Sequence, residues 1–568
     1  MPSPTDALQL HLAYEPRPLK FGTSGRRGLV VDLTQLEIYT NVLAEIHYLQ
    51  SLDPSEGGIR SGEDFYFAHD LRPSSTKCVE NGRGGLCQAV EQAARDGGMR
   101  PINLGAIPTP ALTFFALQHG KGSVMVTGSH IPFDRNGYKL NTSKGELLKK
   151  DEQPINDAVQ LMREKLLAQS YAESLFNEQG MFRDGPGSIV PATDEGRTAY
   201  IQRYLDFFEG QSLQGMKVLA YQHSAVGRDV LVEILEKLGA EVTPAGRSDT
   251  FVPIDTEAID QAQLDTIQGL CDETGKPFDA IVSTDGDSDR PLLVAPEEGK
   301  LRFFGGDILG MLVAEFLEAD AVVVPISSND AIDRLSLARV TEPKTKIGSP
   351  YVISGMQHAL SKGRRRVCGW EANGGFLTGS NIEHNGKVLA ALPTRDAMLP
   401  LLCAMFAARK RQFTLPGLFA TLPKRFSRAS LIRNFPRPTS MKIIERFSPP
   451  VASIQEACFE SGNVTAYDSN RLAVAVSSSD SAKLDQIRQE LQTVFSDAAG
   501  FAPIFRVNYT DGIRMSFSNG DVAHIRPSGN ADELRIYSVA DEQDRADAIV
   551  SQGVAEPSGL LRHLESMV

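Results

Sequence analysis

The chain has 568 residues, of which 41% are hydrophobic and 23% are charged, a composition typical of folded globular proteins. Global disorder is therefore excluded, and at about 150 residues per domain the length suggests several domains. The net charge of −13 disfavours a general nucleic-acid binder, which needs a basic face. A local cluster of arginines could still hold a small anion.

The cysteines and the apolar segments indicate where the protein works. The six cysteines contain no Cys-x-x-Cys pair, which disfavours a disulfide framework and a zinc site. The N-terminal residues lack a basic segment followed by an apolar one, so we expect no signal peptide. The longest apolar stretch, residues 388–408, is interrupted by Arg395 and Asp396 and is too polar to span a membrane. We expect a cytoplasmic protein with no membrane or nucleic-acid partner.

A pattern of apolar strand, loop, amphipathic helix and second strand recurs three times, in residues 65–105, 217–246 and 321–350. The third copy ends on the strand predicted at 341–350. The helix of the second copy is the clearest, because one face is apolar and Gly239 stands where a glycine would end it. Short apolar strands that alternate with helices predict α/β layers with mixed or parallel sheets. Three related domains are favoured over a single α/β sheet with divergent repeats.

The last part of the chain reads differently. Alternating strands with Asp-Gly and Asn-Gly turn signals occupy residues 461–477, 505–529 and 533–539, and residues 481–498 have a helical period. This predicts a C-terminal α+β domain, and a charged helical segment over 148–178 closes the first domain. The expected fold class is three α/β domains plus this α+β domain, with borders at 1–208, 209–303, 304–425 and 426–568.

The first candidate site is the sequence VMVTGSHIPFDRNGYKL around Ser129. A buried strand runs into a Thr-Gly-Ser-His turn, so the hydroxyl stands at the carboxyl end of a strand, where α/β sheets bind ligands. The alternative is an ordinary turn. Hydrolysis by a Ser-His-Asp triad is poorly supported, because the chain has no Gly-x-Ser-x-Gly elbow.

The second candidate, FDAIVSTDGDSDRPLLV, places Asp285, Asp287 and Asp289 at two-residue spacing, followed by Arg290. Alternate carboxylates in a turn can converge on one hard cation, and Mg²⁺ usually leaves positions open for a phosphate. The similarity to an EF-hand is superficial, because Arg290 stands where that loop requires glycine. We favour a Mg²⁺ site over a plain surface turn.

Two further loops carry polar groups. In HIRPSGNADELRIYSV, Arg526 and the Ser528–Asn530 turn offer donors that suit a phosphate, with Arg535 further on. In VCGWEANGGFLTGS, Glu371 and Asn373 lie between glycines and suit sugar hydroxyls. Each could also be an ordinary turn.

These four loops, together with the opening FGTSGRRG, resemble the α-D-phosphohexomutase superfamily, and the resemblance covers essentially the whole chain in the family's order. It implies three related α/β domains and a smaller C-terminal domain around a central active-site cleft. The residues that it assigns fall into three sets. The catalytic set is Ser129 as phosphoserine with Arg27, His130, Lys139 and Arg290 around the phosphoryl group. The metal set is one Mg²⁺ held by Asp285, Asp287, Asp289 and a phosphoserine oxygen of Ser129. The substrate set is Glu371 and Asn373 for sugar hydroxyls, and Arg526, Ser528, Gly529, Asn530 and Arg535 for the other phosphate.

The chain departs from the family pattern at four positions. Ile131 replaces the usual asparagine after Ser-His, and Asn373 and Gly375 stand where serine and histidine are typical. Ser349 occupies a place where several members have histidine, which leaves the general acid or base there unassigned.

The resemblance implies reversible phosphoryl transfer between the 1- and 6-positions of a hexose phosphate, with a hexose 1,6-bisphosphate as intermediate and activator. Mannose phosphate is the favoured substrate, and glucose or glucosamine phosphate the alternatives. Outside this enzyme class stand a non-catalytic sugar-phosphate-binding homologue, which would need neither Ser129 nor the three aspartates, and a metal-dependent phosphatase. The sequence does not indicate an oligomeric state.

Overall fold

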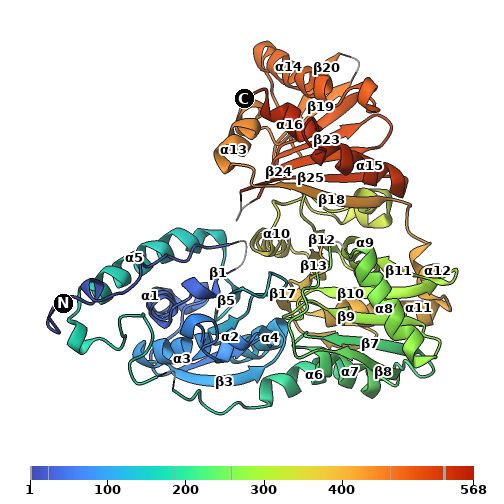
Figure 1. Cartoon of the computed structure of the whole chain (residues 1–568). Coiled ribbons are helices and arrows are strands. Elements are labelled where there is room, and N and C mark those ends of the chain that lie inside the picture. Colours follow the sequence, from blue (N-terminus) through green and yellow to red (C-terminus); the bar gives the residue numbers. More distant parts are fainter. Residues whose placement is uncertain (1–2, 23–24, 186, 258, 461, 529–531) are drawn as a thin grey trace. The chain divides into compact units, whose positions relative to one another are not determined.

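The computed structural model describes residues 3–22, 25–185, 187–257, 259–460, 462–528 and 532–568. The chain divides into two compact units (Figure 1). Unit 1 comprises Met1–Ala319 and Leu360–Leu418, and unit 2 comprises Asp320–Ala359 and Phe419–Val568. This division is coarser than the four expected domains, so their borders stay predictions.

The first sheet of unit 1 has the strand order β1-β5-β4-β2-β3, with the short β6 paired to β5. Its strands β2, β3 and β4 are parallel, whereas β5 is antiparallel to β4 and β1. Phe65 and Phe67 of β2 pack with helices α1 and α3 on one face, and Tyr66 meets α4 on the other. The strands are β1 (Arg26–Leu29), β2 (Asp64–His69), β3 (Arg100–Ala106), β4 (Ser123–Val126), β5 (Arg135–Thr142) and β6 (Gly145–Glu146). The helices are α1 (Gln35–Ser51), α2 (Pro73–Thr76), α3 (Leu86–Asp96), α4 (Thr109–His119), α5 (Glu152–Ala168) and α6 (Glu195–Phe207).

The second sheet repeats this arrangement in the order β11-β10-β9-β7-β8. Strands β7, β8 and β9 are parallel and β10 is antiparallel to β9, so β7 to β10 match β2 to β5 one for one. The strands are β7 (Lys217–His223), β8 (Glu241–Arg247), β9 (Ala280–Thr284), β10 (Pro291–Glu297) and β11 (Lys300–Phe304), with helices α7 (Arg228–Lys237) and α8 (Gln261–Thr274). The expected repeat of the strand-helix-strand pattern is therefore present in these two sheets.

The rest of unit 1 contains antiparallel strands of a third sheet, a two-stranded sheet and three helices. Strand β14 (Phe376–Thr378) pairs with β13 (Val367–Trp370) and β17 (Leu392–Asp396), and β15 (Ile382–His384) pairs with β16 (Lys387–Leu389). Helices α9 (Gly306–Phe316), α11 (Met398–Arg411) and α12 (Leu415–Phe419) complete this part. The apolar stretch at residues 388–408 thus forms strand β17 and most of α11. Among the described residues, none of the helices has the length and apolar character needed to cross a bilayer.

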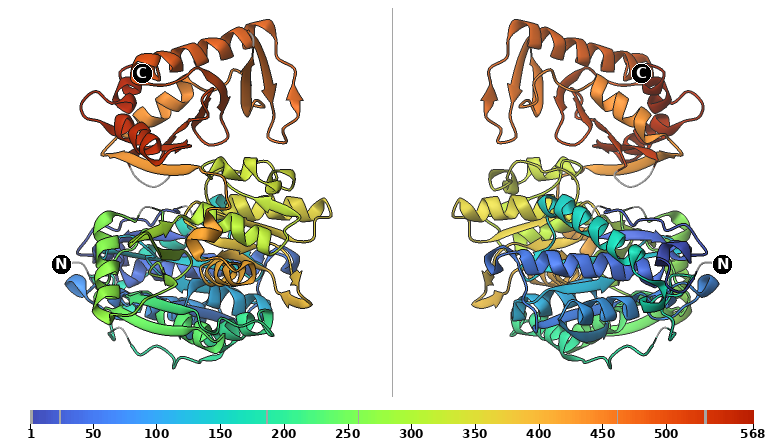
Figure 2. Two further views of the ribbon diagram at one scale, coloured as in Figure 1. Left: turned by 90° about the vertical axis from the view of Figure 1, so that its right-hand side faces the viewer. Right: turned by 90° about the vertical axis from the view of Figure 1, so that its left-hand side faces the viewer.

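Unit 2 is built on one antiparallel sheet, coloured orange to red in Figure 2. Its order is β18-β25-β24-β23-β22-β19-β20-β21, and four of the helices of unit 2 share one core with the strands. The strands are β18 (Phe426–Arg433), β19 (Glu456–Glu460), β20 (Asn463–Tyr467), β21 (Ala473–Val474), β22 (Ile504–Asn508), β23 (Ile513–Phe517), β24 (Val522–Pro527) and β25 (Glu533–Ala540). The helices are α13 (Arg437–Arg446), α14 (Ser478–Val494), α15 (Gln543–Val554) and α16 (Leu560–Glu565). The expected C-terminal α+β domain is present.

Two local expectations were wrong. The segment 341–350 forms no strand: it makes only isolated bridges from Thr341 and Thr345 to the chain at Val322 and Pro325, after strand β12 (Ala321–Val323) and two 3₁₀ turns. Helix α10 (Ser349–Ser361) begins inside that segment. In the first domain, α5 ends at Ala168 and does not continue over the predicted helical segment 148–178.

Candidate active site

The two repeated sheets bring two loops of equivalent position together. The turn with Ser129 follows β4, and the turn with Asp285 follows β9, the matching strand of the second sheet. Both are carboxyl ends of strands beside the point where the strand order reverses, the usual ligand site of such sheets. The Ser129 hydroxyl donates a hydrogen bond to Asp285 Oδ2 over 2.7 Å, so the two loops meet directly.

Ser129 is held in an unusual backbone conformation. Its φ is 52°, in the left-handed region that non-glycine residues rarely adopt. Its N–H donates to Thr127 Oγ1 over 2.8 Å, and the Thr127 hydroxyl and the Gly128 N–H both donate to Asp70 Oδ2. Because Asp70 follows β2, the neighbour of β4 in the sheet, this carboxylate fixes the turn from the adjacent strand. Such strain persists only where the surroundings enforce it, and it is common at functional sites.

A buried arginine secures the rest of the same turn. Arg72 donates hydrogen bonds to the backbone carbonyls of Ser129 at 3.0 Å and of Pro132 and Arg135 at 2.8 Å, and also to that of Ile131. Its guanidinium, 2% exposed, thus bonds along the whole loop from Ser129 to Arg135. The Ile131 position contributes its carbonyl here, a contact that does not depend on which side chain stands there.

The space that Arg72 occupies explains the glycine at position 128. A Cβ at Gly128 would lie 2.5 Å from Arg72 Cζ and Nε. We expect Gly128→Ala to lower the free energy of unfolding by about 1–3 kcal/mol, because overpacking displaces the guanidinium, and to reduce turnover by moving Ser129. Chemical denaturation and steady-state assays measure both effects. Gly269→Ala, in open space on α8, is the control and should leave both unchanged or be slightly stabilising. Wild-type values for Gly128→Ala would contradict this account of the turn.

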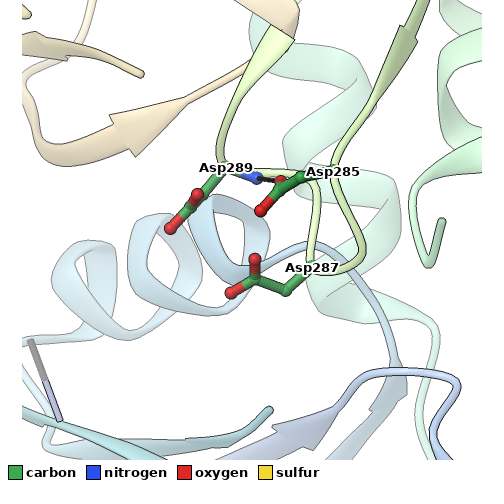
Figure 3. A group of neighbouring side chains, drawn as sticks. All are labelled: Asp285, Asp287 and Asp289. Atoms are coloured by element: carbon green, nitrogen blue, oxygen red, sulfur yellow. Dashed lines mark hydrogen bonds between the residues drawn. The ribbon is translucent and has the colours of Figure 1, made fainter. Parts of the chain in front are cut away.

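The three aspartates form a buried cluster. Their carboxylates extend to the same side of the loop (Figure 3), and one oxygen from each lies within 4.8 Å of the others. Asp285 Oδ1 accepts the N–H groups of Asp289 and Arg290, at 3.1 and 3.2 Å. Asp287 Oδ1 and Asp289 Oδ1 are buried and make no hydrogen bond with the described residues. Buried carboxylate oxygens are normally satisfied, so this pair fits the oxygen-ligand set of a hard cation.

The charges around the cluster also fit a cation. Burial and the neighbouring Asp287 and Asp289 raise the pKa of Asp285 well above its usual range. Burial acts in the same direction on Asp289, yet Arg395 and Lys139 hold its pKa below the usual range. The nearby cations thus do not offset all three carboxylates. Because a divalent cation would favour the charged form of Asp285, the donor set fits Mg²⁺.

Cationic side chains lie beside the aspartate cluster. Lys139 Nζ lies 2.7 Å from both Asp287 Oδ2 and Asp289 Oδ2, and Arg290 Nε lies 3.6 Å from Asp289 Oδ1. Burial and the nearby Arg290 lower the pKa of Arg27 to about 10, so this guanidinium still carries its charge at neutral pH. Buried guanidinium and ammonium groups beside a serine hydroxyl can stabilise a phosphoryl group.

His130 differs from these cations. Its Nδ1 lies 3.4 Å from the Ser129 hydroxyl. The charge of Arg290, burial and the charge of Arg27 lower the pKa of His130 well below its usual range. The imidazole is therefore neutral, and it can exchange hydrogen bonds beside Ser129 without adding positive charge.

Glu371 and Asn373 lie in the tight connection between β13 and β14. The Asn373 side-chain amide donates to Glu371 Oε2 over 3.2 Å, and its own Oδ1 accepts the Gly375 N–H over 2.9 Å. Glu371 Oε2 also accepts a hydrogen bond from Arg395 Nη1 over 3.1 Å. Both predicted sugar-binding residues are therefore buried, fixed and joined through Arg395 to the aspartate cluster of the same unit.

Sequence reasoning missed three supporting residues. Arg395 had a signal, because a charged residue inside an apolar stretch is normally buried with a partner. Thr109, at the start of α4, donates its hydroxyl to Asp287 Oδ2 over 2.7 Å and had no signal in the sequence. Arg72 follows a predicted strand end, which was the only indication that it could reach the Ser129 turn.

The remaining predicted residues belong to unit 2. Arg526 of β24 and Arg535 of β25 are directly opposite in the antiparallel pair and so share one face. Like charges opposite one another are destabilising, and an anion bound between them would relieve the repulsion. Asp511 and Glu533 each pair with one of them, at 3.0 Å. Ser528 is buried at the end of this hairpin, and Gly529 and Asn530 lie outside the described residues.

Ser349 is also in unit 2. It is the first residue of α10 and is buried. The N–H of Ile347, just before it, donates to Asp511 Oδ2 over 3.0 Å, the same carboxylate that pairs with Arg526. The start of α10 and the arginine hairpin are thus tied together within unit 2.

Known proteins are similar to this chain in sequence and fold. The three α/β/α domains of the phosphoglucomutase/phosphomannomutase family match residues 18–165, 198–299 and 305–426 in order. A phosphomannomutase of Sinorhizobium fredii is 36% identical over 94% of this chain and 98% of its own length. A phosphomannomutase of Salmonella muenchen is 35% identical over 94% of both chains. A solved structure of a family protein from Burkholderia thailandensis has a TM-score of 0.60 at 15% identity, covering 96% of this chain and 97% of its own.

Proposed function

The chain belongs to the phosphoglucomutase/phosphomannomutase family, and on this premise we propose that it transfers a phosphoryl group reversibly between the 1- and 6-positions of a hexose phosphate. The observation that carries the proposal is the Ser129 hydroxyl, buried and 2.7 Å from Asp285 in a cluster of three carboxylates. A phosphoserine at this position would place phosphate oxygens beside the three carboxylates, an arrangement that a divalent cation would stabilise.

In the first half-reaction, the bond between Ser129 Oγ and phosphorus breaks, and Ser129 Oγ takes up a proton. A new P–O bond forms to the free hydroxyl of a hexose 1- or 6-phosphate, which releases its proton. The hexose 1,6-bisphosphate then turns over in the site. In the second half-reaction, the Ser129 hydroxyl releases its proton and takes the other phosphoryl group, and the product hydroxyl takes up a proton. Phosphoserine is restored and no phosphate is lost to water. A hexose 1,6-bisphosphate acts as activator because it rephosphorylates free Ser129.

Phosphoryl transfer needs positioning and charge stabilisation more than covalent chemistry from the protein. Arg27, Lys139 and Arg290 would hold the oxygens of the transferring group, and neutral His130 would hydrogen-bond beside it. Asp285, Asp287 and Asp289, with a phosphoserine oxygen, would hold one Mg²⁺ per chain, which supplies Lewis-acid polarisation of the phosphoryl group.

The substrate side of the proposal rests on the remaining loops. Glu371 and Asn373 would receive sugar hydroxyls, and Arg526, Ser528, Gly529, Asn530 and Arg535 would hold the phosphate that is not reacting. Mannose phosphate is the favoured substrate, because two relatives that match this chain nearly end to end are phosphomannomutases. A cytoplasmic location stays a prediction from the sequence.

A coupled assay with mannose, glucose and glucosamine 1-phosphates, compared by kcat/KM, tests the proposal. We expect the highest kcat/KM with mannose 1-phosphate and dependence on a hexose 1,6-bisphosphate. Release of inorganic phosphate in place of the isomeric sugar phosphate would indicate a phosphatase. Binding without turnover of any of the three would indicate a non-catalytic homologue.

The role of Arg526 can be separated from the chemical step. Arg526→Ala removes one charge-assisted contact, worth about 1.5–3 kcal/mol, and should weaken hexose phosphate binding accordingly. It should leave the phosphoryl group already on Ser129 in place, although kcat can fall because remote binding energy also orients the substrate. Titration calorimetry with hexose phosphate, and with unphosphorylated hexose as control, measures the loss. Wild-type affinity for the phosphate would mean that this hairpin is only a turn.

A further inference from the structure

One buried guanidinium joins the two halves of the candidate site in unit 1. Arg395 of β17, with 3% of its side chain exposed, donates from Nε and Nη2 to Asp289 Oδ2, at 3.1 and 2.9 Å. Its Nη1 donates to Glu371 Oε2 over 3.1 Å. Asp289 belongs to the loop after β9 and Glu371 to the loop after β13, so the fork spans two loops that share no strand pairing.

The backbone around Arg395 leaves room for it. A Cβ at Gly375 would lie 2.6–2.8 Å from Cδ, Cγ and Cβ of Arg395. Any side chain at position 375 would therefore collide with the Arg395 side chain. The loop that carries Glu371 and Gly375 therefore packs closely against the Arg395 side chain.

We propose that Arg395 is a positioning residue for substrate binding: it holds the Glu371 carboxylate at a fixed place relative to the aspartate cluster. This proposal rests on the proposed function, since it assigns Glu371 to the sugar. The guanidinium does not contact the substrate in this scheme. It holds the Glu371 carboxylate, which does contact the substrate. Its pairing with Asp289 keeps that carboxylate in a fixed position relative to the aspartate cluster.

The geometry of the fork gives a selective test. A lysine at position 395 keeps the charge but has a single nitrogen on a shorter reach, close to the place of the arginine Nε. The ammonium can still pair with Asp289, whereas the contact made by Nη1 with Glu371 is lost. Arg395→Lys should therefore weaken the binding of the sugar phosphate and leave the binding of Mg²⁺ intact.

The affinity for hexose phosphate is measured by calorimetry with all variants in a Ser129→Ala background, so that no turnover occurs during the titration. The ligand is the hexose 1-phosphate that the wild-type protein converts best, and Mg²⁺ alone is titrated separately. We expect Arg395→Lys to raise the Kd for the sugar phosphate about tenfold, the loss of one charge-assisted contact. The Kd for Mg²⁺ should stay within about threefold, because the charge and the Asp289 contact remain.

A double-variant cycle shows whether Arg395 acts through Glu371. In a Glu371→Gln background, Arg395→Lys should add less than about twofold to the Kd, because the contact is already weakened. Full additivity, unchanged sugar affinity or an equal loss of Mg²⁺ affinity would each overturn the proposal. If Arg395→Lys does not fold, Gly375→Ala, which displaces the same side chain, takes its place. It should raise the Kd for the sugar phosphate, and the cycle with Glu371→Gln should again be less than additive.

The matched control is Arg163→Lys. Arg163 of α5 makes a buried, two-pronged pair with Glu37 of α1, and both residues belong to helices and not to a candidate site loop. Arg163→Lys should lower the melting temperature and leave the Kd values for the sugar phosphate and for Mg²⁺ unchanged. If the wild-type protein neither binds nor converts hexose phosphates, the proposed function fails. If it converts them and Arg395→Lys binds them normally, only the role of Arg395 fails.

Discussion

Replacement of Ser129 by alanine should abolish mutase activity, with kcat lowered on the order of 10⁴-fold or more, because the group that carries the phosphoryl between half-reactions is lost. Intact-mass measurement should find one labile phosphate on the wild-type protein after treatment with hexose 1,6-bisphosphate and none on Ser129→Ala. The change removes one hydrogen bond to Asp285 and a 3.4 Å contact with His130 Nδ1, a small loss that the fold should survive.

Ser123→Ala is the matched control for this experiment. Ser123 is the first residue of β4, the strand that precedes the Ser129 turn. It is equally buried and accepts a hydrogen bond from the Asn141 side chain over 3.1 Å. Its loss should cost stability and leave both the phosphorylation and the turnover in place. Full activity of Ser129→Ala without added bisphosphate would rule out a phosphoserine mechanism.

The parts of the fold that could be predicted from the sequence are those set by local patterns. Strand β9 and the aspartate turn after it were predicted because an apolar run ends at Asp285 and carboxylates then alternate. Helix α7 and its glycine terminus at Gly239, with φ 94°, follow from a 3.6-residue apolar period. The turn at Ser129 was predicted in the same way, from a buried strand that ends in small polar residues.

The parts that could not be predicted depend on contacts between distant segments. Nothing local in β17 indicates that Arg395 pairs with Asp289, more than a hundred positions earlier, because a sequence shows that a charge is buried but not which partner it meets. Arg72 is similar: its hydrogen bonds go to carbonyls, which every residue offers. The strand predicted at 341–350 does not form, and the reason is local. Pro343 has no N–H to donate to a strand pairing, and Gly348 takes a φ of 129° before α10.

Asp287→Asn should reduce kcat about 10²–10³-fold, the loss typical when one preorganised charge contact is removed from a transition state. The fold should be spared, because Asp287 is one of three crowded buried carboxylates. Lys139 loses its contact with the charged Asp287 side chain but keeps its contact with Asp289 at 2.7 Å. In EDTA Asp287→Asn should still fold, with a melting temperature somewhat below that of the wild type, because Lys139 and Thr109 lose their contacts with a carboxylate whose pKa they help to hold below its usual range. Turnover of the wild type should stop in EDTA.

Addition of Mg²⁺ separates a metal ligand from a structural aspartate. A ligand that binds only the folded state raises the melting temperature with its concentration, so Mg²⁺ should stabilise the wild type and have little effect on Asp287→Asn. Asp151→Asn is the control: this buried carboxylate accepts hydrogen bonds from Tyr48 and from the Leu148 N–H, away from the cluster. It should lower the melting temperature and keep the full response to Mg²⁺. Undiminished turnover in EDTA, or an equal Mg²⁺ response in Asp287→Asn, would refute the metal assignment, because the free oxygens of Asp287 and Asp289 would then serve no cation.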